Sequence, residues 1–590
     1  MKKSILIVLA LLLVNMAMAQ MKVTGTVTSS EDGSPIPFAT VLVQGARNVG
    51  ASTDLDGKYS FDNVSKDAVL IFSYIGFTTQ QVPINGRSVI NVVLVPDATR
   101  LDEVMVVAYG TTTKGTFTGA ASVVKNDAIK DVPSITFENA LNGKVAGLQI
   151  TTLSGQAGST SAIRVRGIGS MNASNEPLYV IDGVPVVSGS AGQMSGYIYS
   201  TSNVMSSLNT ADIESITVLK DAAASSLYGS RAANGVILIT TKRGKQGRTI
   251  VNFKASVGIT PSWATDNFEV ATTEQQVEMY YENFWNAGVY YQNRTQQDAS
   301  VRALQQLNNR FAKHGYTFTA PDHTVKTLTI GGDRAGQYFD WEEVLFRTSV
   351  YQTYDLSVSG ATESSNYYTS LSYTKEQGRI PVNSFDRITG RVNLTQKVGK
   401  SVEFNTNINI ARSGKVGYND TRALGNNYFL QSRNLMWGLY WPTDYVTGAP
   451  WTLRYGSYAY NPIFYNNEWN NNSTTLRISA NETVTVKILP ELTFKTIFSY
   501  DNAGTLDHLY YSPVHFLGSA SKGSVREMST NVNKLVSSTT LNFNKTFAQK
   551  HTIGLLVGWE AEENKTDQKL PHLLSGPSLE EPSRRYEPER

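Results

Sequence analysis

The chain of 590 residues contains no cysteine. This absence excludes disulfide bonds, zinc sites with cysteine ligands and a lipid attached to an N-terminal cysteine. All six histidines lie beyond residue 313, and none belongs to an H-E-x-x-H or H-x-x-E pattern. The sequence therefore predicts a protein without a metal or any other cofactor.

An excess of charge and catalytic motifs are missing as well. The 52 lysines and arginines nearly balance the 49 aspartates and glutamates, and the net charge of +3 leaves no basic footprint for nucleic acid. We find no G-x-S-x-G nucleophile motif, no phosphate-binding loop and no dinucleotide fingerprint between a strand and a helix. These absences argue against an enzyme and against a nucleic-acid-binding protein.

Long apolar runs are confined to the N-terminus. Lys2 and Lys3 precede the apolar residues 5–14, and Ala17-Met18-Ala19 has the small residues of a cleavage site. The alternative is a transmembrane anchor, but the run is shorter than the roughly 20 residues that a spanning helix needs. We predict a signal peptide over residues 1–19, cleaved between Ala19 and Gln20, and hence an exported protein.

Residues 20–97 have the pattern of a small β-sandwich. Strands are expected at 38–43, 69–74 and 89–95, where β-branched and aromatic residues are frequent. Asp54, Asp56 and Gly57 suggest a calcium loop, but a third ligand before the glycine and a glutamate after it are missing. The sequence favours a plain turn.

Residues 98–125 are predicted to be a linker. Within it, the β-prone run 101–110 is led by two carboxylates. The run by itself is typical of an ordinary strand. An extended segment with free backbone groups could also add as a strand to the sheet edge of a partner.

Residues 126–247 predict a compact α/β domain. A helix is expected to begin at Phe137, and strands are expected at 163–167, 177–185, 213–219 and 236–241. Asp221 is placed to cap a helix over 222–228.

Residues 248–569 show long alternation of apolar and polar residues, which predicts roughly nine strands. The best examples lie at 251–259, 402–410 and 492–500. Short links join the strands between 350 and 414, whereas the connections 261–350, 413–473 and 502–522 are long. This asymmetry favours an antiparallel transmembrane β-barrel with short periplasmic turns and long outer loops. A soluble β-sandwich also alternates and stays open as an alternative.

Four fragments occur in one order behind the signal peptide and the sandwich: 141–147 (LNGKVAG), 163–167 (IRVRG), 179–183 (YVIDG) and 221–229 (DAAASSLYG). Together they resemble the plug signature of the SusC/RagA family of TonB-linked outer-membrane proteins. The sandwich, with its Gly25-Thr26-Val27 and 53–59 turn, resembles a carboxypeptidase-regulatory-like domain. The resemblance assigns plug roles to Gly143, Gly147, Arg164, Arg166, Gly167, Asp182, Gly183, Asp221, Tyr228 and Gly229. It identifies a TonB box at Asp102, Glu103, Val104, Met105, Val106 and Val107.

The resemblance implies a mainly β protein: the regulatory-like sandwich, a plug at 126–247 and the first part of a barrel at 248–569. It implies active uptake of an oligosaccharide or peptide across the outer membrane of a Gram-negative bacterium. The implied partners are the TonB protein, a SusD-like surface lipoprotein and outer-membrane lipid, with the sandwich and box in the periplasm. The alternatives are a surface binding or signalling receptor on the same scaffold, and a secreted glycan-binding β-protein.

The connection 413–473 is crowded with aromatic rings and asparagines, among them Trp437, Trp441 and Trp451. Aromatic faces over sugar rings, with amides for the hydroxyl groups, would form a ligand platform. The other interpretation is that these rings pack the loop on itself.

Residues 570–590 lose all periodicity and carry four prolines amid mixed charge. Barrels of energised transporters need about 22 strands around a plugged lumen. The sequence therefore predicts an incomplete barrel that ends in an aberrant or disordered tail.

Overall fold

The computed structural model describes residues 20–30, 32–44, 50–74, 77–96, 104–107, 110–113, 119–132, 134–152, 154–172, 174–189, 203–221, 225–262, 271–418, 435, 438–456, 459–547, 551–569 and 574–575. Residues 1–118, 244–250 and 359–366 form one compact unit. The remaining residues form a second unit, which holds the plug and most of the large sheet. The predicted cleavage residue Ala19 lies outside the described residues, and Gln20 begins the first strand.

The first unit contains the predicted β-sandwich. One sheet has the order β4 (Lys58–Ser65), β1 (Gln20–Ser29), β7 (Val92–Leu94), and the other has the order β3 (Gly50–Ser52), β2 (Thr40–Val43), β5 (Val69–Ser73), β6 (Gln80–Pro83). Alternate residues of both sheets, including Val23, Val41 and Phe72, are fully buried between them. The fold class predicted for this part is confirmed.

The 54–58 segment is a plain turn. The Asp54 carboxylate accepts hydrogen bonds from the backbone N–H groups of Asp56 at 2.9 Å and Lys58 at 2.8 Å. Among the described residues, no three His, Asp or Glu side chains lie close enough together to hold a metal ion.

The predicted TonB box is partly described. Residues Val104–Val107 form strand β8, which pairs antiparallel with β9 (Gly110–Thr113). Asp102 and Glu103 lie outside the described residues. The hydrophobic part of the box is therefore extended backbone.

The plug is built on a mixed sheet with the order β10 (Ala121–Lys125), β15 (Ile213–Leu219), β16 (Val236–Thr241), β13 (Leu178–Ile181), β14 (Val184–Pro185). Strands β11 (Leu148–Thr152) and β12 (Ser161–Val165) form a separate hairpin. The helix predicted at Phe137 is the short α2 (Phe137–Ala140), whose N-cap is Thr136. The hydrophobic core of the plug includes Phe137, Met205, Ile216 and Ile237.

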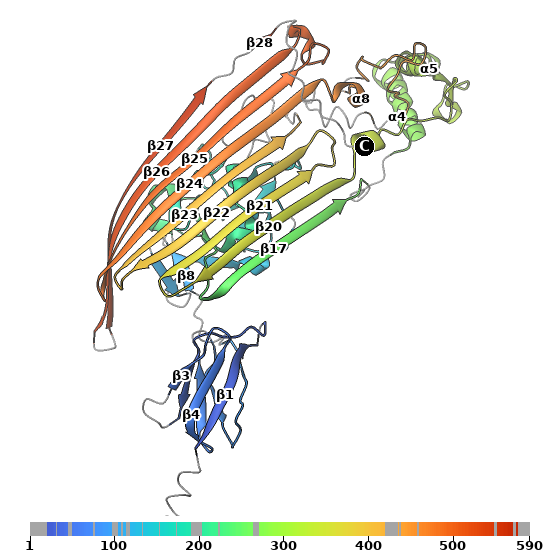
Figure 1. Ribbon diagram of the computed structural model, residues 1–590. Coiled ribbons are helices and arrows are strands. Elements are labelled where there is room, and N and C mark those ends of the chain that lie inside the picture. Colours follow the sequence, from blue (N-terminus) through green and yellow to red (C-terminus); the bar gives the residue numbers. More distant parts are fainter. Residues whose placement is uncertain are drawn as a thin grey trace, which may run out of the picture. The chain divides into compact units, whose positions relative to one another are not determined.

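After the plug, the described residues form a ten-stranded antiparallel sheet, which we call the wall (Figure 1). Nine long strands follow one another in order, and the two-residue β28 (Leu574–Ser575) pairs with β26. They are β17 (Gly247–Thr260), β20 (Ser349–Ala361), β21 (Ser365–Gln377), β22 (Ser384–Val398), β23 (Val402–Val416), β24 (Trp469–Leu489), β25 (Leu492–Tyr511), β26 (Ser524–Phe547) and β27 (His551–Lys569).

The predicted positions of the wall strands are confirmed, but several strands extend further than predicted. Strand β25 runs to Tyr511 and β26 starts at Ser524. The long connection predicted at 502–522 is therefore wrong, because these residues continue the ladder as far as the pair Tyr511 and Ser524. Polar outward residues such as Asn502 and Asn531 conceal the strand pattern there, but they hydrogen-bond to each other at 2.7 Å.

The two faces of the wall have opposite character. On the inner face, which the plug contacts, Arg387, Arg391 and Asn393 of β22 are buried. On the outer face of the same strand, Ile388 and Val392 are 47% and 45% exposed. A soluble sandwich would bury the apolar face of its strands, so this arrangement excludes that alternative for the wall.

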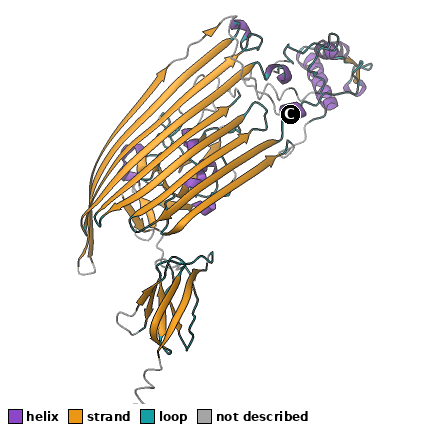
Figure 2. Ribbon diagram, in the orientation of Figure 1, coloured by secondary structure: helices purple, strands orange, loops and turns teal. Residues whose placement is uncertain are grey.

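The connection between β17 and β20 contains helices that alternation did not predict (Figure 2). They are α4 (Thr273–Asn286) and α5 (Gln296–Phe311). The sequence held a signal for both, because Thr272 with Gln275 forms a capping box and Thr295 caps α5. Among the described residues, no helix is both long enough and apolar enough to cross a bilayer.

Candidate functional site: the contact between plug and wall

The glycines of the plug signature are turn residues. Gly143, Gly147, Gly167, Gly183 and Gly229 all have φ between 69° and 97°, in the left-handed region that favours glycine. Arg166 (φ 59°) and Asp182 (φ 51°) take up the same region beside them. The signature therefore fixes the sharp turns of the plug.

Two charged signature residues hold those turns in place. The Asp182 carboxylate accepts hydrogen bonds from the backbone N–H of Thr241 at 2.9 Å and from its hydroxyl at 2.7 Å. The amide of Asn393 on the wall donates to the same hydroxyl at 2.9 Å. Arg164 pairs with Glu176 at 2.8 Å. Asp182 thereby links the plug to the wall through one shared threonine.

The helix-cap role predicted for Asp221 stays a prediction, because the start of that helix at 222–224 lies outside the described residues. The Asp221 carboxylate accepts the backbone N–H of Ala120 at 2.7 Å, across the chain's entry into the plug. Its backbone carbonyl accepts the N–H of Ser225 at 3.0 Å. Residues 222–224 of the predicted helix lie outside the described residues, and Ser226–Ala232 form a 3-10 helix in which Tyr228 is buried.

Arg477 makes the most extensive contact between wall and plug. Its guanidinium forms a two-bond pair with the Asp501 carboxylate, at 2.9 and 2.8 Å. It also donates to the Val187 carbonyl at 3.2 Å and the Ser207 hydroxyl at 3.1 Å of the plug. Asp501 in turn accepts the backbone N–H of Val187 at 2.7 Å. The Arg477 and Asp501 side chains are 2% and 1% exposed.

Arg387 is a second buried donor from the wall. Its guanidinium donates to the carbonyl oxygens of Ser206 at 2.7 Å, Ile135 at 3.0 Å and Leu208 at 3.3 Å. A guanidinium with five fixed N–H donors suits this arrangement, because several carbonyls of one plug segment converge on it. Arg387 and Arg477 therefore hold the same segment, residues 203–208.

Asp212, immediately after that segment, is bound by three wall side chains. Its carboxylate accepts hydrogen bonds from the hydroxyls of Tyr368 at 2.9 Å and Ser370 at 2.7 Å. Arg391 approaches it at 3.5 Å, and both side chains are almost fully buried. The wall thus supplies the countercharge for an acidic plug residue that water cannot reach.

The tip of the plug hairpin β11–β12 is held where β22 begins and β23 ends. The Gln156 side chain exchanges two hydrogen bonds with the backbone of Tyr418, at 2.9 and 3.2 Å. The side chain of Asn383 accepts the N–H of Ala157 at 2.9 Å. Phe385 fits against Gly158, where a Cβ atom would approach its ring to 2.3 Å. Only glycine can occupy this position next to Phe385.

A further ionic contact involves the last long strand. Arg231 of the plug hydrogen-bonds to Glu560 and Glu562 on β27. Lys534 on β26 reaches Glu562 at 2.8 Å. Buried or half-buried polar groups on strands from β21 to β27 therefore contact the plug.

Glu138 lies inside the plug itself. It is 2% exposed, and its carboxylate accepts hydrogen bonds from Asn203 at 2.7 Å and from the Tyr179 hydroxyl at 3.4 Å. Burial raises the pKa of Glu138 to about 7. The bond to Asn203 joins helix α2 to the start of the segment that the wall arginines hold.

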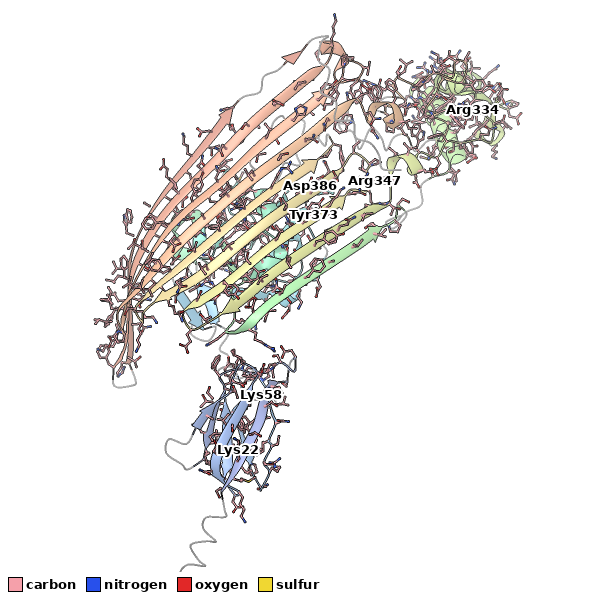
Figure 3. The ribbon with its side chains drawn as sticks, viewed as in Figure 1. Lys22, Lys58, Arg334, Arg347, Tyr373 and Asp386 are labelled. Carbon is pink, nitrogen blue, oxygen red and sulfur yellow. The ribbon has the colours of Figure 1, made fainter. Side chains whose placement is uncertain are left out.

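The predicted ligand aromatics belong to a separate cluster. Trp451 is 8% exposed and packs with residues of α4, α5 and the 311–345 segment in one core. Its ring lies 4.3 Å from that of His314, whose pKa burial lowers to about 4. Trp441 donates to the Tyr316 hydroxyl at 2.9 Å, and the Arg334 guanidinium lies over its ring, 4.0 Å from the centroid. Arg334 itself is labelled in Figure 3, in the helical insertion. Trp437 lies outside the described residues.

Sequence reasoning missed the wall side of this contact. Arg387, Arg391, Arg477 and Asp501 look like ordinary polar members of alternating strands. The one sequence signal for these contact residues is a charged residue at an inward strand position, among asparagines and threonines. This signal can be used only after the inner face of the wall is known.

Comparison with known proteins agrees with this architecture. Residues 113–236 match the TonB-dependent Receptor Plug Domain, and residues 23–106 match the CarboxypepD_reg-like domain. The chain is 30% identical over 553 residues to TonB-dependent receptor P39 of Formosa agariphila, covering 93% of this chain and 47% of P39. It is 32% identical over 410 residues to TonB-dependent receptor SusC of Bacteroides thetaiotaomicron, covering 69% of this chain and 35% of SusC.

Among solved structures, the fold is similar to the RagAB peptide importer. The open-open state gives a TM-score of 0.61 at 23% identity, over 80% of this chain and 53% of that chain. The closed-closed state gives 0.58 at 24% identity, over 78% and 52%. The chain belongs to the SusC/RagA family of TonB-dependent receptors. It spans about half the length, or less, of the curated relatives it matches.

Replacing Arg477 by leucine should destabilise the protein by about 3–5 kcal/mol, because Asp501 would remain buried without its countercharge. Thermal or denaturant unfolding in detergent would measure the loss. Arg412→Leu is the matched control, since its side chain is 57% exposed and lies 3.9 Å from Asp386. That change should cost less than about 1 kcal/mol. Equal effects of the two substitutions would contradict the assigned role of Arg477.

The burial of Glu138 predicts that the stability of the fold decreases as the pH rises. Its pKa is about 7 in the folded plug and 4.5 in the reference state, so folding favours the protonated carboxyl. The stability that this proton contributes is complete below pH 4.5 and is lost as the pH rises to about 7. Glu138→Gln should abolish this dependence and exceed the wild type at pH 8 by up to about 3 kcal/mol. Parallel unfolding curves at pH 5 and pH 8 for both proteins would show whether this holds.

Trp451→Ala should lower the free energy of unfolding by about 3–5 kcal/mol, because the ring fills a buried core. Leu453→Ala in the same connection is the control; Leu453 is 58% exposed and its loss should cost little. Denaturant unfolding compares the two. A stable Trp451→Ala protein whose ligand affinity falls by about 1–3 kcal/mol would instead support the ligand platform.

Proposed function

We propose that this chain serves TonB-dependent import of a large nutrient, an oligosaccharide or a peptide, across an outer membrane. The observation that carries the proposal is the plug itself. It covers the inner face of the wall, and buried arginines with their partners hold it there. A plug held in this way blocks passage until work is done on it.

The bonding of the plug explains why an energy source is needed. Arg387 and Asp212 have partners across the contact, and Arg477, although paired with Asp501 on the wall, also donates across it to Val187. Separating plug and wall would break several hydrogen bonds of charged groups at once. Thermal motion alone rarely opens such a contact. A mechanical pull through the chain that precedes the plug would meet this need.

The predicted TonB box lies in that preceding chain. Its Val104–Val107 part is extended and pairs with only four residues of β9. A two-stranded hairpin of this size is marginally stable, so it could exchange its pairing for the sheet edge of a partner. We propose that the TonB protein binds at Asp102–Val107 and transmits force to the plug.

The outer face of the wall supports an outer-membrane location. Exposed residues such as Phe404, Ile410, Phe498 and Leu541 present an apolar surface that lipid would cover. The relatives that match are TonB-dependent receptors. With the wall in the outer membrane and the TonB protein reaching the box from the inner side, the sandwich and the box would lie in the periplasm.

Similarity to SusC and to the fold of a peptide importer supports a substrate larger than ordinary pores admit. We propose a SusD-like surface lipoprotein as the partner that delivers it. The helical insertion and the aromatic connection would then lie on the outer side. The second candidate is a surface binding or signalling receptor on the same scaffold, which would bind the ligand without importing it.

Deleting Asp102–Val107 should abolish uptake while surface binding of the nutrient stays nearly intact, because the box supplies coupling and not ligand contacts. Growth and uptake on a panel of glycans and peptides, with binding measured on whole cells, would test this. Val106→Pro should act like the deletion, since proline removes a backbone donor from the strand, whereas Val106→Ile should transport normally. Uptake that survives both changes would refute the energised mechanism; binding without uptake in the wild type would favour the receptor.

A further inference from the structure

The chain enters the plug through a single short passage. Gly119 is the first residue of the second unit, and Ala120 follows it at the edge of the plug sheet. The Asp221 carboxylate accepts the N–H of Ala120 at 2.7 Å, and the Ala120 carbonyl accepts the N–H of Lys220 at 3.0 Å. Ala120 is therefore held on both sides of its backbone.

The strand behind this passage is weakly held elsewhere. Strand β10 is the terminal strand of its sheet and pairs only with β15 within the described part of the chain. Of its five residues, only Val124 is buried. At the far end, the Asn126 amide donates to the Ile213 carbonyl at 2.6 Å and to the Thr210 carbonyl at 3.3 Å.

The partner strand β15 is anchored much more firmly. It starts directly after Asp212, which Tyr368, Ser370 and Arg391 bind, and after the segment that Arg387 and Arg477 hold. Tension that arrives from the linker therefore acts on β10 against a fixed neighbour. A pull that peels β10 away from β15 loads the bonds of Ala120 first and those of Asn126 last.

We propose that Asp221 is the latch of the plug: its carboxylate keeps β10 closed until the linker is pulled, and its rupture starts the opening. This rests on the proposed function, which supplies the pull. A hydrogen bond from a backbone N–H to a carboxylate is stronger than one to a neutral acceptor, so an acid suits a latch. The turn behind it is fixed by Ser225, whose N–H and hydroxyl both donate to the Asp221 carbonyl, at 3.0 and 2.9 Å.

The latch can be tested by pulling on the protein in a lipid bilayer. The chain has no cysteine, so Thr113→Cys gives a unique handle ahead of the plug. The measured quantity is the rate of the first rupture at constant tension. Asp221→Ala should raise this rate about 10- to 100-fold, and Asp221→Asn, which keeps the shape and a neutral acceptor, should lie between it and the wild type.

Asn126→Ala is the matched control, because it weakens the other end of the same strand. It should leave the first rupture unchanged within about twofold and affect only later events. A first rupture that does not respond to Asp221→Ala or to Asp221→Asn would overturn the latch, as would an equal response to Asn126→Ala. The measurement needs neither nutrient nor TonB protein, so a failure of the import proposal would show in uptake and leave this result standing.

Discussion

The structure depends on one constraint: guanidinium groups of the wall are buried and must find acceptors, which the plug supplies together with wall residues such as Asp501. Arg387 and Arg477 both reach backbone oxygens of the plug near residues 203–208. An unpaired buried arginine costs several kcal/mol, so these hydrogen bonds stabilise the contact between plug and wall. The plug segment has little regular structure beyond a 3-10 turn, Val204–Ser207, and its carbonyls remain available for this reason.

The same constraint sets the character of the two faces of the wall. Successive residues of a strand point to opposite sides, so a strand whose inward positions carry Arg387, Thr389 and Arg391 presents Ile388 and Gly390 outward. A slip of one residue would turn the arginines outward and the apolar groups towards the plug. The plug contacts thus specify the register of the strands as well as holding the plug.

The long connections follow a different principle. The insertion between β17 and β20 and the connection between β23 and β24 share one aromatic core, with Tyr281, Phe311, Trp341 and Trp451 among its members. His314 lies within it, and its Nδ1 accepts the N–H of Trp441 at 3.4 Å. Rings that suggested a ligand platform therefore contribute to the packing of two segments about a hundred residues apart.

The sequence alone determined the features that depend on local spacing. Alternation predicted the strands from 251 to 561, the glycines predicted the turns of the plug, and missing calcium ligands predicted the plain turn at Asp54. These signals are local, because strand periodicity and a positive φ leave their mark within a few residues. The capping box of α4 and the Thr295 cap of α5 belong to the same kind of signal, although the search for alternation did not use them.

Only the tertiary structure decided which charges matter. Asp221 has the spacing of a helix cap, and no local pattern indicates that its carboxylate accepts the N–H of Ala120, about a hundred positions earlier. Arg477 has the pattern of any polar strand residue until Asp501 and Val187 are placed beside it. The worth of a charged side chain depends on its burial and on which group approaches it from another part of the chain, and neither quantity is written in the neighbouring residues.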